Sequence, residues 1–300
     1  MQRRAALSTV ASIAAVSVGW SPAAARAEQA PSAAGVPAQT PAQVARQLRF
    51  SAVLANPTAK ALVDQTLWLY LPVKRTSTQD FVAVETAVPH ALLTDGVGHS
   101  LLKISIAALP PFAQRPFLLN VRTLQYASPR ATAADDLKDW LQAERFTEVS
   151  DSRVQARAQA LKGNSAWQTA RNIYEWVADN IAYAGYIADD LGALYALTEL
   201  KGDCTEYAFL VVALARANQI PARMVGGYVA DRDLAPRADE YHNWAELYVE
   251  GAWRLVDAQK RNWLLPCADY TAFRLFRGKA INAVGLAHRF AVEGAMEVRI

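Results

Sequence analysis

Cysteine and histidine are scarce in this sequence, whose 300 residues include two cysteines, Cys204 and Cys267, and four histidines. None of them follows the C-x-x-C or H-E-x-x-H spacing of zinc sites, so we expect no metal or other cofactor. Calcium stays open without a motif to support it, because the acidic pair Asp189-Asp190 is more often a solvated turn. The two cysteines allow one disulfide at most.

An excess of charge of one sign is also missing. Lysine and arginine number 31 against 28 aspartates and glutamates, which gives a formal net charge of +3. The basic residues are scattered and form no stripe interleaved with aromatics, so we expect no nucleic-acid partner. Apolar residues make up 52% of the chain, with eight tryptophans and eleven tyrosines, which is typical of a globular protein with a sizeable core.

The N-terminus has the pattern of an export signal. The stretch 3–20 begins with two arginines and continues as a run of apolar and small residues, and residues 25–27 fit an A-x-A cleavage site. This pattern predicts a signal peptide over 1–27 and a periplasmic or secreted protein. The apolar run is too short and too rich in alanine and serine for a stable membrane span, although an uncleaved anchor helix is the alternative. Residues 28–45, rich in Ala, Pro, Gln and Thr, predict a disordered linker.

The hydrophobic periodicity changes near residue 130. Between 46 and 130, short apolar runs bounded by turn residues predict a small β-sandwich-like domain, with strands at 48–54, 66–71, 81–86, 101–106 and 117–124. From 131 to 300 apolar residues first recur at helical spacing, which predicts helices at 134–141, 154–161, 165–180 and 193–200. The tail beyond 263 is predicted to add a strand pair that completes a sheet.

The segment 202–207, GDCTEY, predicts a helix that begins at Cys204. Asp203 is suited to cap this helix, and Glu206 stands three residues later, as in a capping box. Backbone N–H groups and the helix dipole at such a position lower the pKa of a thiol, and the same N–H groups can hold a developing oxyanion. We therefore expect Cys204 to be a nucleophile.

His242 and Asp257 lie on two strand-like runs joined by Glu250-Gly251, which predicts a two-residue hairpin turn. With that turn Trp244 opposes Asp257, and His242 is the diagonal neighbour of Asp257 on the same face, with Cα atoms about 7–8 Å apart. A three-residue turn would destroy this geometry. Either residue alone is best interpreted as an ordinary strand residue, but the pair together with a helix-start cysteine favours a thiol enzyme.

Four segments carry a resemblance to a known family: GDCTEYA at 202–208, IPAR at 220–223, YHNWAE at 241–246 and WRLVD at 253–257. They resemble the transglutaminase-like superfamily over roughly residues 165–262. The resemblance implies an α+β fold with a papain-like core, in which the helix bearing the cysteine packs on an antiparallel sheet. It also implies a triad of Cys204 as nucleophile, His242 as base and then acid, and Asp257 as the group that orients His242.

The family implies acyl transfer through a thioester, which water hydrolyses or an amine captures. Its animal cross-linking members carry several extra domains and calcium sites, for which this chain has no room. We therefore expect a cysteine peptidase or amidohydrolase that hydrolyses a peptide or amide bond in a peptide or protein substrate, such as a cell-wall peptide. The alternatives are an amine-transferring, cross-linking transglutaminase and a catalytically silent binding or scaffold protein.

Contacts to the oxyanion and the substrate are less defined by the sequence. Tyr186 is an upstream aromatic candidate, with Tyr183 and Tyr195 as competitors, and Trp244 is a further candidate.

The state of the two cysteines is a separate question. A disulfide between Cys204 and Cys267 would be ordinary in an exported protein and would favour the silent alternative. The resemblance and the helix-start position lead us to expect that Cys204 is free.

Overall fold

The computed structural model describes residues 42–132 and 137–299. The predicted signal peptide over 1–27 and most of the linker predicted over 28–45 lie outside the described residues, as does the start of the helix predicted at 134–141. No helix in the described part of the chain has the length and apolar character needed to cross a membrane. The described residues belong to one compact unit.

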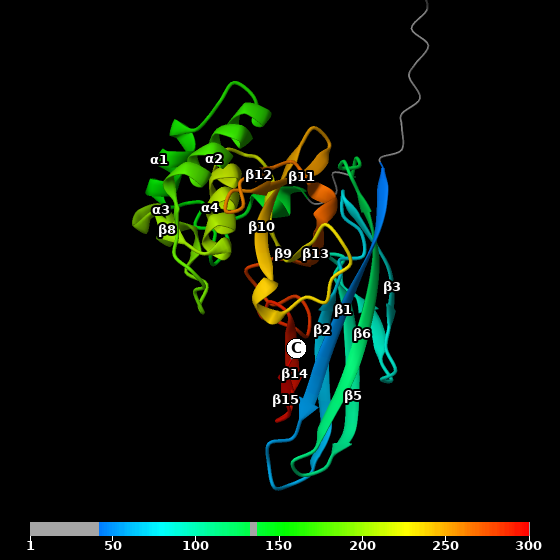
Figure 1. Cartoon of the computed structure of the whole chain (residues 1–300). Helices are drawn as coiled ribbons and strands as arrows, with labels where there is room; N and C mark the ends of the chain where they lie inside the picture. The colour runs from blue at the N-terminus through cyan, green and yellow to red at the C-terminus, as the bar shows by residue number, and fades with distance from the viewer. Residues whose placement is uncertain (1–41, 133–136, 300) are drawn as a thin grey trace, which may run out of the picture. The chain divides into compact units, whose positions relative to one another are not determined.

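Two four-stranded antiparallel sheets enclose the core of the β-rich region (Figure 1). Their strand orders are β15-β1-β6-β3 and β14-β2-β5-β4. The strands are β1 (Gln43–Ala55), β2 (Leu62–Leu71), β3 (Gln79–Glu85), β4 (Ala91–Thr94), β5 (Ser100–Leu109), β6 (Gln114–Tyr126), β14 (Phe290–Glu293) and β15 (Glu297–Arg299). The five strands predicted in this region are confirmed, and β4 is an additional strand. The prediction of a strand pair beyond residue 263 that completes one sheet is wrong, because β14 pairs with β2 and β15 pairs with β1, in different sheets.

The second half of the chain forms a five-stranded sheet in the order β12-β11-β10-β9-β13, with helices beside it (Figure 1). Its strands are β9 (Ala222–Val229), β10 (His242–Val249), β11 (Ala252–Asp257), β12 (Asn262–Trp263) and β13 (Tyr270–Leu275), and β7 (Ala182–Tyr183) pairs separately with β8 (Lys201–Gly202). The helices are α1 (Ser152–Ala160), α2 (Ala166–Asn180), α3 (Gly192–Glu199) and α4 (Cys204–Ala217), with 3-10 turns at Leu137–Leu141, Ala238–Glu240 and Cys267–Asp269. The expected α+β fold with a helix on an antiparallel sheet is confirmed.

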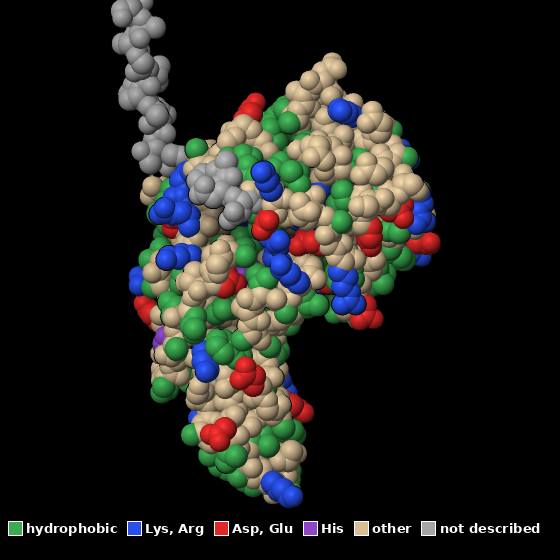
Figure 2. Space-filling view, turned by 180° about the vertical axis from the view of Figure 1, so that it is seen from behind, with side chains coloured by type: hydrophobic (Ala, Val, Ile, Leu, Met, Phe, Trp, Pro, Cys, Tyr) green, Lys and Arg blue, Asp and Glu red, His purple; other side chains and the backbone are tan. Residues whose placement is uncertain are grey.

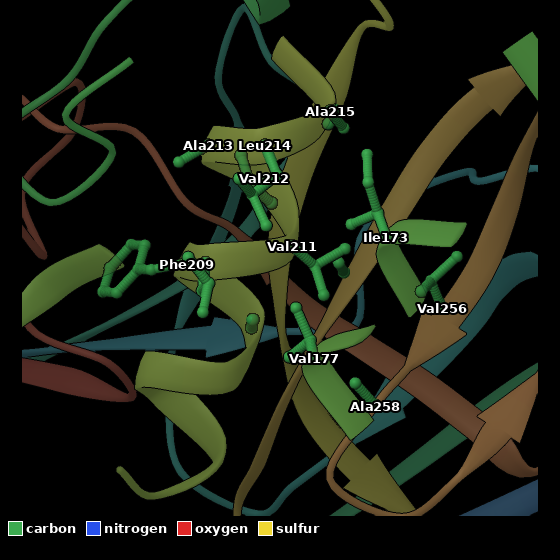
Figure 3. Close-up of a cluster of buried hydrophobic side chains, with 14 of the residues drawn as sticks. Ile173, Val177, Phe209, Val211, Val212, Ala213, Leu214, Ala215, Val256 and Ala258 are labelled. Carbon is green, nitrogen blue, oxygen red and sulfur yellow. The ribbon is translucent and has the colours of Figure 1, made fainter. Parts of the chain in front are cut away.

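Helix α4 is apolar on nearly every side because it lies between the other helices and the sheet. Figure 3 shows part of this core, with Ile173 and Val177 of α2 near Val211 of α4 and Val256 of β11. Phe209 is fully buried there, so its replacement by alanine is expected to cost about 3–5 kcal/mol. This packing fixes the N-terminus of α4, where the candidate nucleophile lies.

The β10–β11 hairpin has the predicted two-residue turn. Val249 pairs with Ala252, and φ is 51° at Glu250 and 74° at Gly251. Two central residues with positive φ characterise a type I′ turn, whose twist matches that of the flanking strands. The register on which the His242–Asp257 geometry depends is therefore confirmed.

The five-stranded sheet also contacts the β-rich region. Tyr228 of β9 and Phe273 of β13 pack against Phe50 of β1, with ring centroids 5.4 and 5.7 Å from its ring. The connection between β9 and β10 is held by β1, since Leu234 N donates to Gln47 O at 3.1 Å. The segment that leads into His242 is therefore anchored on the β-rich region.

Candidate active site

Cys204 is the first residue of α4, as the capping pattern predicts. The Asp203 carboxylate accepts a hydrogen bond from Thr205 N at 2.7 Å, and the Glu206 carboxylate accepts one from Asp203 N at 3.1 Å. This reciprocal capping box fixes the first turn of the helix. The backbone N–H of Cys204 itself stands at the positive end of the helix, where it can meet a developing oxyanion.

The two capping carboxylates also hold the loop before α3. The second Asp203 oxygen accepts from Ile187 N at 3.0 Å, and the second Glu206 oxygen accepts from Leu191 N at 3.0 Å. Burial raises the pKa of Glu206 to about 7 in spite of these hydrogen bonds. The loop beside the thiol is thus tied to the helix that carries the thiol.

His242 and Asp257 form a hydrogen-bonded pair, with His242 Nε2 2.7 Å from Asp257 Oδ2. Both side chains are buried. Because Nε2 is engaged by the carboxylate, Nδ1 is the ring nitrogen that is left to exchange a proton with a thiol. Trp244 stacks on the imidazole, with ring centroids 6.3 Å apart and an interplanar angle of 24°.

Asp257 is held in its ionised form by three donors, from β10, from the turn after β11 and from β13. The carboxylate also accepts hydrogen bonds from Lys260 N at 3.0 Å and from the Tyr270 hydroxyl at 2.7 Å. Burial alone would raise the pKa of Asp257, but His242 and these two donors outweigh it and lower the pKa below its usual value. An ionised Asp257 both orients the imidazole and stabilises the imidazolium that proton transfer would create.

The charge state of the Cys204 thiol differs from the sequence-based expectation. Burial, together with the negative charge of Asp203, raises the pKa of the Cys204 thiol to about 11. The Asn243 backbone N–H and the Thr205 hydroxyl act in the opposite direction and are outweighed. The pKa of the Cys204 thiol is therefore raised overall, because loss of hydration is the largest effect on it.

Asn243 is a site residue that the sequence analysis missed. Its side-chain Nδ2 donates to Thr205 Oγ1 at 2.9 Å and lies 3.9 Å from Cys204 Sγ. The amide thus links the strand that carries His242 to the helix turn that carries Cys204. Its position next to His242 in the YHNWAE segment was the available signal, but the alternation of the strand gave no reason to direct it at the helix.

Tyr270 is the second residue that was missed. It reaches Asp257 because β13 pairs with β9, a contact between segments about 45 residues apart in the sequence. Burial raises the pKa of Tyr270 far above its usual range, so its hydroxyl remains a donor to the carboxylate. No local motif marks this tyrosine.

Cys204 lines a cleft with two lobes. The His242 lobe, of about 440 Å³, is lined by Cys204, His242 and Lys260 among others. The Arg289 lobe, of about 340 Å³, is lined by Cys204, Asn243 and Arg289 among others. The structure thus brings Cys204 and His242 to one cavity wall, with Asp257 directly behind His242.

The aromatic candidates from the sequence have different positions. Tyr186 is 85% exposed and lines the Arg289 lobe, while its competitor Tyr183 lines the His242 lobe. Tyr195 is not among the residues that line either lobe. Trp244 is only 2% exposed and contacts His242 and Tyr270, so it supports the imidazole from within the sheet and is not placed to contact a substrate.

The two cysteines are both free, as expected for Cys204. Cys267 is buried, and its S–H group donates to the carbonyl oxygens of Tyr126 and Ala127 at 3.4 and 3.2 Å. Asp190 of the acidic pair lies 3.2 Å from His288 Nε2. Across the described residues, no group of three or more His, Cys, Asp or Glu side chains is arranged to hold a metal ion.

Comparisons with known proteins bear on this arrangement. Residues 153–258 match the family model described as the transglutaminase-like superfamily. The structure is similar to that of a candidate cysteine protease from Cytophaga hutchinsonii, with 18% sequence identity and a TM-score of 0.60 over 86% of this chain and 89% of that chain. The periplasmic domain of TgpA from Pseudomonas aeruginosa has 15% identity and a TM-score of 0.40 over 70% of this chain and 89% of that chain. No curated protein matches the sequence.

Proposed function

We propose that the transglutaminase-like domain of this chain is a thiol-dependent acyl-transfer enzyme that hydrolyses a peptide or amide bond through a Cys204 thioester. The observation that carries the proposal is the 2.7 Å His242–Asp257 pair in a cavity whose wall includes Cys204. The superfamily match over residues 153–258 supports this class of chemistry.

In the proposed reaction, His242 Nδ1 takes the thiol proton as the sulfur of Cys204 attacks the carbonyl carbon of the substrate. The Cys204 backbone N–H at the helix N-terminus faces the charge that develops on the carbonyl oxygen. The imidazolium, stabilised by Asp257, then gives its proton to the leaving amine, and a thioester remains. Water, deprotonated by His242, attacks the thioester and releases the acid and the free thiol.

A raised thiol pKa is compatible with this sequence of steps. Cys204 does not need to be a thiolate in the resting enzyme if the proton moves to His242 during attack, as in serine enzymes. The proposal therefore requires His242 to be neutral and its Nδ1 free before substrate binds.

We also propose that the protein is exported, on the basis of the sequence pattern over 1–27. Mass spectrometry of the protein purified from the periplasm or medium is expected to find Glu28 as the first residue. If the purified protein still contains residues 1–27, this part of the proposal is wrong.

The enzymatic proposal is tested on purified protein with peptides and cell-wall fragments, in the presence and absence of a primary amine. Hydrolysis is recognised by a mass change of water, and amine transfer by incorporation of the amine. We expect hydrolysis to dominate and Cys204→Ala, His242→Ala or Asp257→Ala to lower the rate by roughly 10³–10⁴-fold.

Cys267→Ala is the matched control, because Cys267 is free but lies outside the cleft, in a buried apolar cluster, and hydrogen-bonds only to backbone carbonyls. It is expected to keep full activity. Incorporation of amine without hydrolysis would favour the cross-linking alternative, and full activity of Cys204→Ala would exclude the thioester mechanism.

A further inference from the structure

The two lobes of the cleft differ in the balance of their charges. The His242 lobe is lined by three carboxylates, Asp231, Asp239 and Glu240, against two cations, Arg232 and Lys260. Arg232 is paired with Asp231 at 3.5 Å. By number, the carboxylates of this lobe exceed its cations, although Asp239 and Glu240 also pair with Arg237.

Every carboxylate of the Arg289 lobe already has a partner. Asp190 faces His288 at 3.2 Å, and Asp239 accepts from Arg237 at 3.1 Å. Asp203, at the start of α4, accepts hydrogen bonds from Thr205 N and from Ile187 N. The negative charges of this lobe are therefore engaged and do not neutralise its cation.

Arg289 is that cation, and among the described residues no carboxylate forms an ion pair with it. Its Nη1 atom is buried and has no hydrogen-bond partner there. The Tyr228 hydroxyl contacts the guanidinium, but no carboxylate of the described residues balances its charge. A partly buried guanidinium without a counter-ion is unfavourable, and an anion in the lobe would compensate it. Guanidinium groups are well suited to carboxylates because they offer parallel N–H donors.

A second arginine, Arg274, also lacks a carboxylate partner among the described residues, although it contacts the Tyr70 hydroxyl and lies 4.4 Å from the centroid of the Phe276 ring. Arg274 is 3% exposed, its Nη1 also has no partner, and it forms no ion pair within the described part of the chain. The positive charges of Arg274 and Arg289 both act on Tyr241, a residue that lines the Arg289 lobe. Two positive charges thus act on one lining residue of the cavity that contains Cys204.

We propose that the Arg289 lobe binds a carboxylate of the substrate, so that the enzyme selects peptides with a free carboxylate near the reacting carbonyl. The proposal names a substrate class for the acyl-transfer site and rests on the proposed function for its role in catalysis. A C-terminal carboxylate and an acidic side chain offer the same chemistry to Arg289. A lobe of about 340 Å³ is within the size range of sites for small ligands.

The test measures binding to the Cys204→Ala variant, so its outcome does not depend on any reaction of the thiol. Three probes are compared by calorimetry: acetyl-tetraalanine as the free acid, the same peptide as a carboxamide, and a carboxamide whose last residue is glutamate. We expect the free acid or the glutamate peptide to bind at least tenfold more tightly than the plain carboxamide, and the stronger of the two identifies the source of the carboxylate. The preference is expected to decrease with added salt.

Arg289→Gln in the same background is expected to reduce the preference to less than twofold, and Arg289→Lys, which keeps the charge, to retain part of it. Arg232→Gln is the matched control, because it removes an arginine from the other lobe, and it is expected to leave the preference intact. Equal binding of all three probes, or a preference that survives Arg289→Gln, overturns the proposal. If the proposed function is wrong, the wild-type protein will instead hydrolyse none of the substrates, independently of how tightly the three probes bind.

Discussion

At the scale of single residues, the proposed reaction requires the Cys204 thiol and the His242 imidazole to act together. Burial raises the pKa of Cys204 to about 11, so the isolated thiol would be ionised in roughly one molecule in 10⁴ at pH 7. An imidazole whose Nε2 is held by Asp257 offers a nearby base at Nδ1. Reactivity near neutral pH is then a property of the pair and not of the cysteine alone.

The first prediction follows from that dependence. We expect iodoacetamide to alkylate Cys204 of the wild-type protein near neutral pH, and His242→Ala to move the rise of the rate toward pH 11, because the thiol then ionises alone. The pH profile of the second-order rate, read by mass spectrometry of the Cys204 peptide, provides the measurement. Identical profiles for the two proteins would show that His242 does not serve the thiol.

Glu206 links the capping box to the stability of the fold. Burial raises its pKa to about 7 from an ordinary value of 4.5, so the folded protein binds more protons than the unfolded chain between these two pH values. Stability must therefore fall as pH rises through this window. Asp80 and Asp95, whose pKa values are lowered to about 2, act at lower pH and do not overlap with it.

We accordingly predict that the free energy of unfolding in urea decreases from pH 5 to pH 8, and that Glu206→Gln reduces this decrease by an amount on the order of 1–3 kcal/mol. Glu175→Gln is the control, since Glu175 lies on an exposed surface of α2 and pairs with Arg171. If the control changes the slope as much as Glu206→Gln does, the burial of Glu206 is not its cause.

At the scale of elements, the β10–β11 hairpin is strained at one position. Glu250 adopts a φ of 51°, in the left-handed region that costs a non-glycine residue roughly 1 kcal/mol, whereas asparagine tolerates it well. Its ion pair with Arg254 at 3.5 Å is exposed and contributes little. Glu250 therefore occupies a left-handed position of the type I′ turn for which asparagine is better suited.

Glu250→Asn is predicted to stabilise the protein by about 0.5–1 kcal/mol without changing the rate of the reaction, because it produces the Asn-Gly sequence that type I′ turns prefer. Gly251→Ala, at a φ of 74°, is the converse variant and should destabilise by a similar amount. Urea unfolding curves and initial rates measure the two effects. A loss of stability in Glu250→Asn would indicate that the turn is not type I′ in solution.

Local patterns explain why some elements were predictable. The capping box and the hairpin each involve residues within a few positions of one another, so the sequence was sufficient for Cys204 and for the His242–Asp257 register. Tyr270 and Arg289 reach the site through strand β13 and through the segment before β14, whose neighbours are far away in the sequence. Periodicity carries no information on such pairing, and the pKa of Cys204 depends on burial that only the packed structure defines.

The surface charges also illustrate the difference between composition and arrangement. Figure 2 shows lysine and arginine side chains interspersed with aspartate and glutamate on the face that it presents. The net charge of +3 is in keeping with this mixture but says nothing of the cleft. Arg289, whose Nη1 atom has no hydrogen-bond partner among the described residues, is recognised only from its contacts.

At the scale of the whole molecule, the β-rich region and the five-stranded sheet are joined in three ways. Phe50 packs against Tyr228 and Phe273, and Leu234 pairs with β1. The chain also returns after the five-stranded sheet to place β14 and β15 beside β2 and β1. Although the sequence predicts a domain boundary near residue 130, these contacts should couple the unfolding of the two regions.

The last prediction is that the protein unfolds in one cooperative transition. Circular dichroism at 222 nm reports mainly on helices α1 to α4, and hydrogen exchange of β5 and β6 reports on the sandwich. We expect the two signals to give the same urea midpoint. Phe50→Ala, which removes a buried ring from the contact, is expected to reduce the free energy of unfolding by about 3–5 kcal/mol and so to lower both midpoints together. A chain ending at residue 289 should show the same joint loss, because it lacks the strands that complete both sheets. Separate midpoints in the full chain would instead mean that the two regions are independent domains. The contact between β1 and the segment before His242 would then not be required to keep helix α4 folded.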